Sequence, residues 1–530
     1  MDSKREAVQD GPALLRQERA QASFPLRDMT HFLDGGPQRT AKKEALRAIA
    51  LQDPLFSLES NQNKAFLSRE ERYRNGLRLV NRVQALRLKH GWTHEERVLF
   101  EEEACTESLP TGLNDVAFVP FVRSQGTEEQ IQKWAVPAEN YEIIGSYSQT
   151  ELGHGSNVQG LQTTALYLPD SDEFELNTDS ITATKWWPGA IAHTATHTVL
   201  MARLLIPDRE NKNKIKDYGV HGFVVQLRCL ETHQPLPGIT LGDIGPKMGS
   251  PAVDNGFMRL QGVRIPRTNM LMRHAQVEKG TGAYSKPPHS KIAYLGMVYI
   301  RVKLVLSAAS ALARGVTVAT RYSAVRRQFG PEPGAPEKQL LDYKLQQYRI
   351  LPHVARTYAL IFTGRYMQNL FDTLSSHLAS YSSSSASSSS DPFATLPLVH
   401  ATSSGLKSWC TFMAAEGLES CRRTLGGHGY AHYSGISEIT AGYVGILAAE
   451  GENYLLTQQT ARYLLKLFEK TKREKRVPEE ASMADYLEKC REEGILEREK
   501  CTATTLQELL LPETLVMMLL SYCFHLFSSN

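Results

Sequence analysis

A block of short strand-like segments, residues 141–272, interrupts a chain whose other parts have helical periodicity. Within the block, stretches rich in Val, Ile, Thr, Tyr and Phe alternate with Gly, Pro, Asp and Asn, the pattern of strands joined by turns. The order of helices, strands and helices lacks the regular alternation of a doubly wound sheet. No Gly-x-Gly-x-x-Gly motif follows a strand, so a Rossmann-type dinucleotide site is not expected.

This zoning predicts an α+β protein with segregated elements. Its expected parts are an N-terminal helical domain at 1–140, a central antiparallel β-barrel or sandwich domain at 141–275, a helical bundle at 276–470, and a linker with the start of a further helical domain at 471–530. Val302–Gln328 contains no proline and many Ala, Leu and Val residues, which favours a core helix of the bundle. The serine tract at 381–390 is expected to be a disordered insertion between two helices.

Charge and cysteine usage exclude several classes of protein. Sixty basic and 57 acidic residues leave a formal net charge of +3, which argues against a nucleic-acid-coating protein. The seven cysteines are scattered without zinc spacing, so we expect reduced thiols, an intracellular compartment and no metal site. Met1–Arg19 has no apolar core like that of a secretory signal. Leu515–Phe527 is apolar but too short to span a bilayer, so no stable membrane insertion is expected.

Two segments of the β block have the chemistry to bind a flat ligand. Gly145–Gly155 combines hydroxyl and amide side chains with glycines that permit close backbone approach, although an ordinary polar loop has the same composition. Lys185–Gly189 places two adjacent tryptophans before a Pro-Gly turn. The indoles either wall a planar ring system or pack in the core, and both interpretations remain open.

Three segments of the second helical zone are candidates for phosphate binding and for acid–base chemistry. Arg326–Gly330 and Gly426–Tyr430 offer an arginine, amides and a glycine-rich turn that suit a pyrophosphate. A helix C-terminus and turn geometry explain the same residues without a ligand. Glu450 follows an apolar run, and apolar surroundings raise a carboxyl pKa towards that of a useful general base. A capping or dipole role near a helix start is the alternative.

Taken together and in this order, these segments resemble the acyl-CoA oxidases of peroxisomal fatty-acid β-oxidation, within the acyl-CoA dehydrogenase superfamily. The similarity runs from about Leu33 to about Lys466. The motifs that carry it are Gln149–Gly155, Lys185–Gly189, Pro237–Pro246, Arg321–Arg326 and Glu450–Asn453. The Trp-Trp-Pro-Gly and Glu-Gly-Glu-Asn forms are similar to the oxidase branch rather than to the mitochondrial dehydrogenases.

The resemblance implies FAD as the cofactor and a homodimer. Thr150 and Gly189 match positions that contact the flavin. Arg326 and Gln328 match an element that reaches the FAD of the neighbouring subunit, although relatives often carry Thr where this chain has Gln328. The pair Gly426 and Gly427 matches glycines near the same cofactor, and Glu450 matches the catalytic base.

The activity implied is the conversion of acyl-CoA and O2 to trans-2-enoyl-CoA and H2O2 in the peroxisome. Two alternatives remain at this point: a dehydrogenase that passes electrons to another flavoprotein, and a non-catalytic truncated subunit. Family members usually continue through another helical domain that often ends in Ser-Lys-Leu, a signal that is not present here. We therefore expect a product truncated at its C-terminus, in which dimer stability and import are in question.

Overall fold

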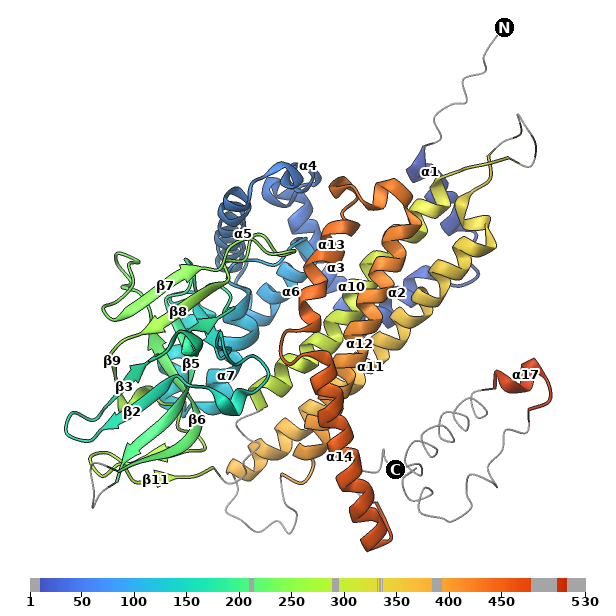
Figure 1. The fold of residues 1–530 in the computed structure, drawn as a ribbon. Helices are drawn as coiled ribbons and strands as arrows, with labels where there is room; N and C mark the ends of the chain where they lie inside the picture. The colour runs from blue at the N-terminus through green and yellow to red at the C-terminus, as the bar shows by residue number, and fades with distance from the viewer. Residues whose placement is uncertain are drawn as a thin grey trace. The chain divides into compact units, whose positions relative to one another are not determined.

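The computed structural model describes residues 10–208, 214–287, 295–330, 332, 335, 337–383, 393–477 and 503–511 (Figure 1). The chain divides into two compact units. One contains Met1–Gly364 and Cys410–Glu452, and the other contains Arg365–Trp409 and Asn453–Asn530. The expected serine insertion lies outside the described residues from 384 onwards, and so does most of the expected C-terminal region, at 478–502 and 512–530.

The N-terminal part is helical. Its helices are α1 (Gly11–Ala20), α2 (Leu26–Asp34), α3 (Pro37–Gln52), α4 (Leu58–Asn63), α5 (Arg69–His90), α6 (His94–Ala104), α7 (Val119–Gln125), α8 (Glu128–Gln130) and α9 (Val136–Glu139). Capping boxes start both α5 and α6, where Ser68 pairs with Glu71 and Thr93 pairs with Glu96. Each box satisfies backbone donors that the first helical turn leaves unpaired.

The central part contains the strands. They are β1 (Gly145–Ser148), β2 (Thr164–Leu168), β3 (Glu173–Asn177), β4 (Lys185–Trp186), β5 (His197–Pro207), β6 (Ile215–Gln226), β7 (Ile239–Asp243), β8 (Gly256–Leu260), β9 (Val263–Pro266), β10 (Gln276–Val277) and β11 (Tyr284–Ser285). The strands β2, β3 and β8 alternate between buried and half-buried positions, which is why sequence patterning detects them.

The β domain is mixed rather than antiparallel throughout. Its largest sheet has the order β1-β5-β2-β3-β9, with β6 also paired to β5, and a second sheet has the order β4-β8-β7. Strand β5 pairs in parallel with β1 and β2, which corrects the expectation of a purely antiparallel domain. These parallel pairs join strands that are distant in the sequence, as crossover connections require. Buried side chains of both sheets share one core that includes Tyr167, Phe174 and Phe223.

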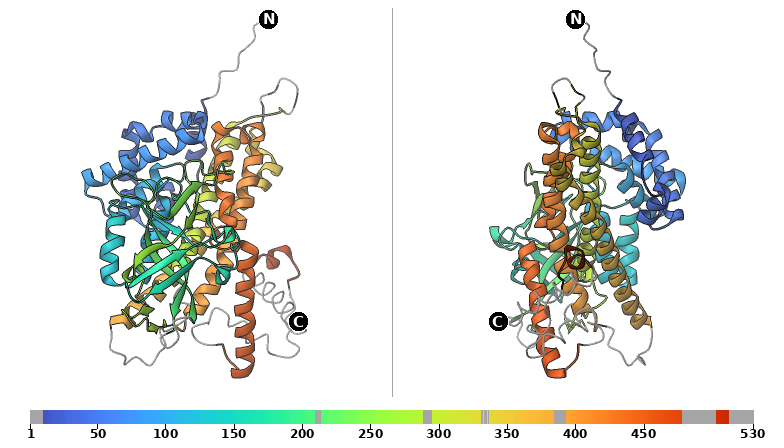
Figure 2. Two further views of the ribbon diagram at one scale, coloured as in Figure 1. Left: turned by 60° about the vertical axis from the view of Figure 1, so that its left-hand side comes forward. Right: turned by 90° about the vertical axis from the view of Figure 1, so that its right-hand side faces the viewer.

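The second helical part contains α10 (Leu295–Val325), α11 (Lys344–Ser383), α12 (Leu396–Thr424), α13 (Ile436–Val444) and α14 (Asn453–Glu474), and the short α17 (Leu506–Leu509) follows. Helix α10 starts earlier and ends earlier than the sequence indicated, so that Arg326 lies just beyond its C-terminus. Near its start, Gly296 lies against Phe121 of α7, and at its end Val325 lies against Gly11 of α1. Figure 2 shows α10 from two further sides.

By length and hydropathy alone, α10 would also qualify as a membrane-spanning helix. However, 56% of its most apolar window is buried inside the protein. Its buried face includes Val302, Val305, Leu312 and Val316. These are the features of a core helix in a helical bundle.

A buried charge network joins α6 to the segment that leads into the β domain. The side chain of Arg97 is fully buried and forms ion pairs with Glu101 and, at 2.8 Å, with Asp115. The hydroxyl of Tyr141 donates to Asp115 at 2.7 Å, and the guanidinium of Arg97 lies 4.9 Å from the centre of the Tyr141 ring. A cation removed from such a network leaves its carboxylates buried without compensation.

We expect Arg97→Met to lower the free energy of unfolding by about 3 kcal/mol, because Asp115 and Glu101 would lose their buried counter-charge. Urea-induced unfolding measures the loss. The exposed Arg74, which pairs with Glu70 on the surface of α5, provides the control, and Arg74→Met should cost less than about 1 kcal/mol. Equal losses in the two variants would contradict the role assigned to the network.

The pH dependence of stability should reflect His197, which is buried at the start of β5. Burial, together with the nearby Lys133, lowers its pKa to about 4 from the ordinary 6.5. Between pH 6.5 and 4 the unfolded chain therefore binds a proton that the folded chain does not, so stability falls as the pH is lowered through this window. We expect His197→Asn to reduce that loss by about 1–3 kcal/mol in urea titrations at each pH, whereas the exposed His90→Asn should not.

Candidate active site

Glu450 lies in a backbone turn that few non-glycine residues adopt. Its φ is +56°, and Gly451 follows with φ +105°. The turn precedes α14, and Nε of the buried Arg301, on α10, donates to the Glu450 carbonyl at 3.1 Å. A left-handed conformation at a glutamate costs free energy and persists only where its surroundings fix it. Such strain concentrates at functional sites, so this turn supports a functional interpretation of Glu450 over a capping role.

The charge of Glu450 acts on Tyr147, a residue of strand β1. Burial raises the pKa of Tyr147 well above its usual range, and the charge of Glu450 raises it further. The Tyr147 hydroxyl donates to Oε1 of Gln149 at 2.8 Å. A carboxylate that acts on the pKa of a buried phenol lies close to it, because charge interactions weaken with distance. Glu450 and the segment that carries Thr150 therefore share one site.

Hydrogen bonds also join the segments of Thr150 and Gly189. The backbone N–H of Trp186 donates to the Thr150 carbonyl at 2.9 Å. The hydroxyl of Ser146 donates to the Gly189 carbonyl at 2.7 Å. A Cβ added at Gly189 would lie 2.9 Å from a methyl carbon of Leu113, which is closer than side chains normally approach. Glycine is therefore required here by packing, and the turn lies directly against the helical part.

The two tryptophans have different surroundings. Trp186 is half-buried and stacks on Phe257 with an interplanar angle of 14°. Trp187 is 54% exposed and has φ +84°, and Ala190 also has a positive φ, of +66°. Asn255 holds the Trp187 carbonyl with a 2.6 Å hydrogen bond from its side-chain amide. Trp186 thus packs within the domain, while Trp187 is presented to solvent by a strained turn.

The remaining predicted residues lie near the C-terminal end of α10. Arg326 is exposed, and the Gln328 amide donates to the neighbouring Arg327 carbonyl at 2.6 Å. Gly426 and Gly427 are exposed, with open space where a Cβ would stand. The Tyr322 ring of α10 contacts the ring of His428, which brings the glycine turn to the same end of the bundle as Arg326.

The predicted residues therefore form two groups rather than one. Thr150, Gly189 and Glu450 belong to the group at the N-terminal end of α10, where Arg301 holds the Glu450 turn. Arg326, Gln328, Gly426 and Gly427 form the other. Arg301 and Val325 are 24 positions apart on one continuous helix, which at 1.5 Å per residue separates the two groups by about 35 Å.

Each group leaves a polar side chain available to a ligand. Across the part of the chain that the structure describes, the Thr150 hydroxyl and the Arg326 guanidinium have no side-chain hydrogen bond or ion pair. The hydroxyl suits a ring edge, and the guanidinium suits a phosphate oxygen. These donors, with the glycine turns that permit close approach, fit a dinucleotide such as FAD. Within the same described ranges, no cluster of His, Cys, Asp and Glu has the arrangement of a metal site.

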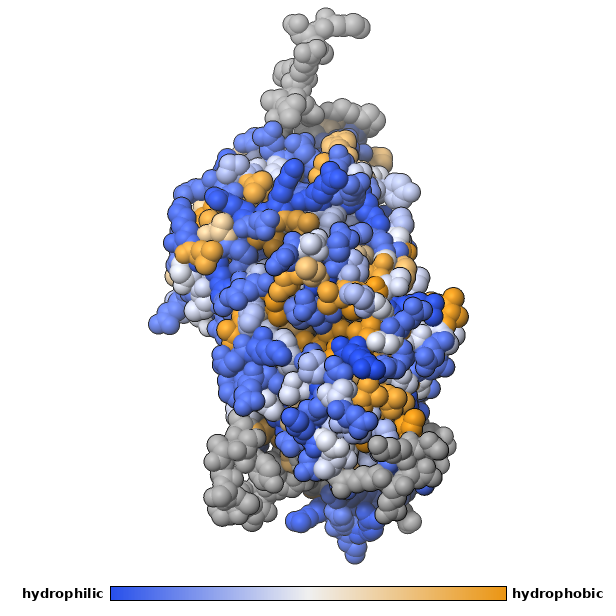
Figure 3. All heavy atoms as spheres, turned by 90° about the vertical axis from the view of Figure 1, so that its left-hand side faces the viewer, coloured by the Kyte–Doolittle hydropathy of each residue, from blue (hydrophilic) through white to orange (hydrophobic). Residues whose placement is uncertain are grey.

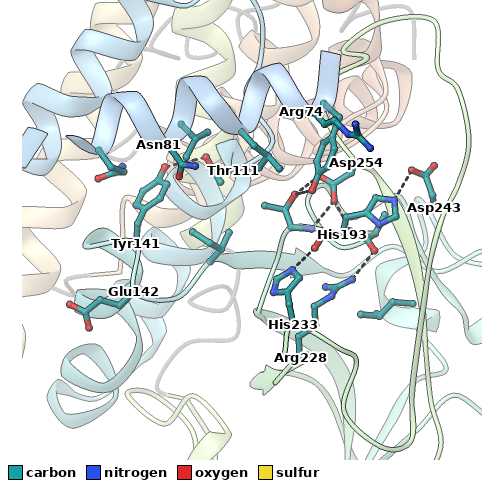
Figure 4. Close-up of a pocket in the computed structure, with 18 of the residues that line it drawn as sticks. Arg74, Asn81, Thr111, Tyr141, Glu142, His193, Arg228, His233, Asp243 and Asp254 are labelled. Atoms are coloured by element: carbon teal, nitrogen blue, oxygen red, sulfur yellow. Dashed lines mark hydrogen bonds and ion pairs between the residues drawn. The ribbon is translucent and has the colours of Figure 1, made fainter. Parts of the chain in front are cut away.

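A cleft of about 1970 Å³ runs between α5 and the β domain. Figure 3 looks onto this side of the chain and shows hydrophobic residues across the middle of the face. In Figure 4, Arg74 and Asn81 both extend from α5. Asn81 lies near Thr111 and Tyr141, and Arg74 lies at the other end of the cleft, where the lining residues are His193, Arg228, His233, Asp243 and Asp254.

The four arginines of the cleft already have partners within the protein. Arg69 pairs with Asp243 at 2.7 Å and Arg74 with Glu70 at 2.6 Å. Arg87 donates to backbone and side-chain oxygens at residues 92, 139 and 140. Arg228 donates to backbone carbonyls at residues 191, 192 and 195, the loop that follows Gly189. Since each of these cations already has a partner within the protein, the cleft offers no unpaired arginine for an anion.

Sequence reasoning missed three residues that shape the site: Tyr147, Arg301 and Asn255. Tyr147 lies within a segment that was singled out, but nothing in the sequence pairs it with a glutamate about 300 positions later. Arg301 is an arginine within an apolar helix, and Lys and Arg are almost never fully buried unless paired. That signal was available and would have indicated a buried partner.

Three family models match the chain in sequence order. "Acyl-coenzyme A oxidase N-terminal" matches residues 25–144, "Acyl-CoA dehydrogenase, middle domain" matches 146–263, and "Acyl-CoA oxidase, C-alpha1 domain" matches 294–465. Among curated proteins, peroxisomal acyl-coenzyme A oxidase 1 of Rattus norvegicus is 39% identical over 475 residues, covering 89% of this chain and 68% of the relative. The Homo sapiens protein of the same name is 38% identical over 503 residues, covering 94% and 73%.

Solved structures of acyl-CoA oxidases also match the chain. Acyl-CoA oxidase 1 of Arabidopsis thaliana matches with a TM-score of 0.87 and 38% identity, over 96% of this chain and 74% of that chain. Acyl-CoA oxidase-2 of Caenorhabditis elegans, bound with FAD, ascaroside-CoA and ATP, matches with a TM-score of 0.82 and 36% identity, over 95% and 72%.

Proposed function

The chain belongs to the acyl-CoA oxidase family, and from this premise we propose which of its residues carry the oxidation of an acyl-CoA by O2. The enzyme is an oxidoreductase that acts on a CH–CH group with oxygen as acceptor. The comparisons do not favour the dehydrogenase or the non-catalytic subunit, since the named relatives and structures are oxidases.

Glu450 is the proposed catalytic base. The thioester of an acyl-CoA acidifies the α-C–H, and a positioned carboxylate removes that proton. The observation that carries this assignment is the strained turn at Glu450. Arg301 donates a hydrogen bond to the Glu450 carbonyl, and the charge of Glu450 raises the pKa of the buried Tyr147 of β1. Bound FAD would accept the hydrogen lost from the β-carbon as hydride and return both electrons to O2 as H2O2.

Glu450→Gln should retain bound FAD but slow the anaerobic bleaching of the flavin by acyl-CoA about 10²–10⁴-fold, because the amide cannot accept the α-proton. Stopped-flow absorbance measures the bleaching, and a peroxide assay in air follows the turnover. Glu452→Gln, two residues further along, is the control and should bleach at nearly the unchanged rate. Normal bleaching by Glu450→Gln would refute the assignment.

FAD is the proposed cofactor, held by both groups of residues in a homodimer. Thr150 and Gly189 would contact the ring system in one subunit. The separation of about 35 Å along α10 prevents Arg326 of the same chain from joining that contact. Arg326, with Gln328 and the pair Gly426 and Gly427, would therefore reach the cofactor of the neighbouring subunit.

The surface around Arg326 has the composition of an interface. Phe329, Tyr430 and Tyr433 are 74–84% exposed, and Phe329 has φ +60°. Aromatic residues and arginine are enriched where proteins associate. A second copy of the chain that packs there would cover these rings.

Arg326→Ala should weaken FAD binding about ten- to a hundredfold, because a charge-assisted hydrogen bond to the cofactor is lost. The control is Arg423→Ala. Arg423 lies at the same end of the bundle but pairs with Glu419, so its replacement should leave the FAD affinity unchanged. Fluorescence titration measures the affinity.

Coexpression of Arg326→Ala with Glu450→Gln should then restore activity at low FAD, since one site of the mixed dimer has both residues intact. Absence of complementation would contradict a site shared between subunits.

We also propose a peroxisomal location. The support is that the curated relatives are named peroxisomal proteins. The acyl-CoA substrate and O2 follow from the family.

A further inference from the structure

A fully buried ion pair joins the two sheets of the β domain. Lys185 is the first residue of β4, in the three-stranded sheet, and Glu151 follows β1, in the larger sheet. Both side chains are 0% exposed, and Nζ of Lys185 lies 3.1 Å from Oε1 of Glu151. Burial of two charges costs several kcal/mol per ion unless each is fully hydrogen-bonded. An ion pair buried at this cost in free energy is expected to have a specific structural role.

The ammonium of Lys185 uses all three of its hydrogens. Besides Glu151, it donates to the carbonyl of Gln149 at 3.0 Å and to the carbonyl of Met201, in β5, at 2.7 Å. Three donors and three acceptors leave the group fully satisfied. One side chain thereby fixes β4, the end of β1 and β5 relative to one another.

The carboxylate of Glu151 is equally saturated. Its Oε1 accepts from the backbone and the hydroxyl of Thr163 at 2.8 and 2.7 Å, and its Oε2 accepts from the backbone of Gln162 at 2.8 Å. Nδ1 of His154 lies 3.2 Å from Oε2. Burial opposes the charge, but Lys185 and these donors hold the pKa of Glu151 below its usual range.

The partners of this pair surround the residues assigned to the flavin. Thr150 lies between Gln149 and Glu151, and Lys185 contacts both of those neighbours. Lys185 also opens the segment that runs through Trp186 to Gly189. Resting on the proposed function, we propose that Lys185 and Glu151 form a positioning pair that sets the spacing between the Thr150 hydroxyl and the Gly189 turn, and thereby the affinity and orientation of bound FAD.

A charged pair suits this task better than an apolar contact. Hydrophobic packing is non-directional, whereas a network in which every donor and acceptor is used permits one arrangement of its backbone segments. Binding sites need their contacting groups held to within about 0.5 Å by supporting side chains. Because the side chains of Lys185 and Glu151 are fully buried, we expect them to act through Thr150 and Gly189 rather than on the cofactor itself.

The test replaces both charges together, Lys185→Met with Glu151→Gln, because removal of one alone would leave an uncompensated buried ion and could prevent folding. The matched control is the ion pair of Arg267 and Asp172, also in the β domain, where Nε lies 2.8 Å from Oδ1 without contact to either flavin segment. Its double variant is Arg267→Met with Asp172→Asn.

We expect the Lys185/Glu151 double variant to bind FAD at least tenfold more weakly and to change the visible circular dichroism of the bound flavin. The control variant should keep both properties within twofold, even if its melting temperature falls as far. The proposal would be overturned if the Lys185/Glu151 variant bound FAD as tightly as the unchanged chain and kept its flavin spectrum. It would also be overturned if the two double variants lost FAD affinity to the same extent.

Measurements on the chain without substitutions show whether the positioning role or the proposed function has failed. If the unchanged chain binds FAD but acyl-CoA does not bleach it, the catalytic assignment fails while the comparison of the two variants still decides the positioning role. If the unchanged chain binds no FAD, both proposals are overturned.

Discussion

The fixed length of α10 is the constraint on which the arrangement of the site depends. The helix is continuous and buried, so the residues at its two ends cannot approach each other. At one end Arg301 donates to the carbonyl of the Glu450 turn. Just beyond the other end Arg326 is exposed, and its guanidinium forms no hydrogen bond or ion pair within the described residues. A dinucleotide that needs both ends therefore needs two chains. The length of α10 is therefore sufficient reason to expect a cofactor site shared between two subunits.

Backbone strain occurs within the first group of residues. Trp187, Ala190 and Glu450 all have positive φ, although none is glycine. Two of them are held from outside their own turns, Trp187 by Asn255 at its carbonyl and Glu450 by Arg301 at its carbonyl. The free energy of this strain is offset by the packing of the β domain and the bundle. Local sequence preference alone would not produce these turns.

The large-scale order of the fold could be predicted from sequence because periodicity is a local property. The helical zones and strands such as β2, β3 and β8 follow from their patterns of burial. Strand β1 was not separated from its loop, since all four of its residues are buried and show no alternation. The parallel pairing of β5 depends on contacts between distant segments, which no local pattern encodes.

For the site, residue types were predictable but partnerships were not. The motif around Glu450 identified the glutamate, yet its proximity to Tyr147 and its support by Arg301 arise only in the folded chain. The continuity of α10 has a further consequence for how such a chain can change. A single inserted residue would turn everything beyond it by about 100° around the helix axis and would move Arg326 away from its direction of approach. Insertions can therefore accumulate in the loops, whereas the residue count between Arg301 and Arg326 should be held constant by selection.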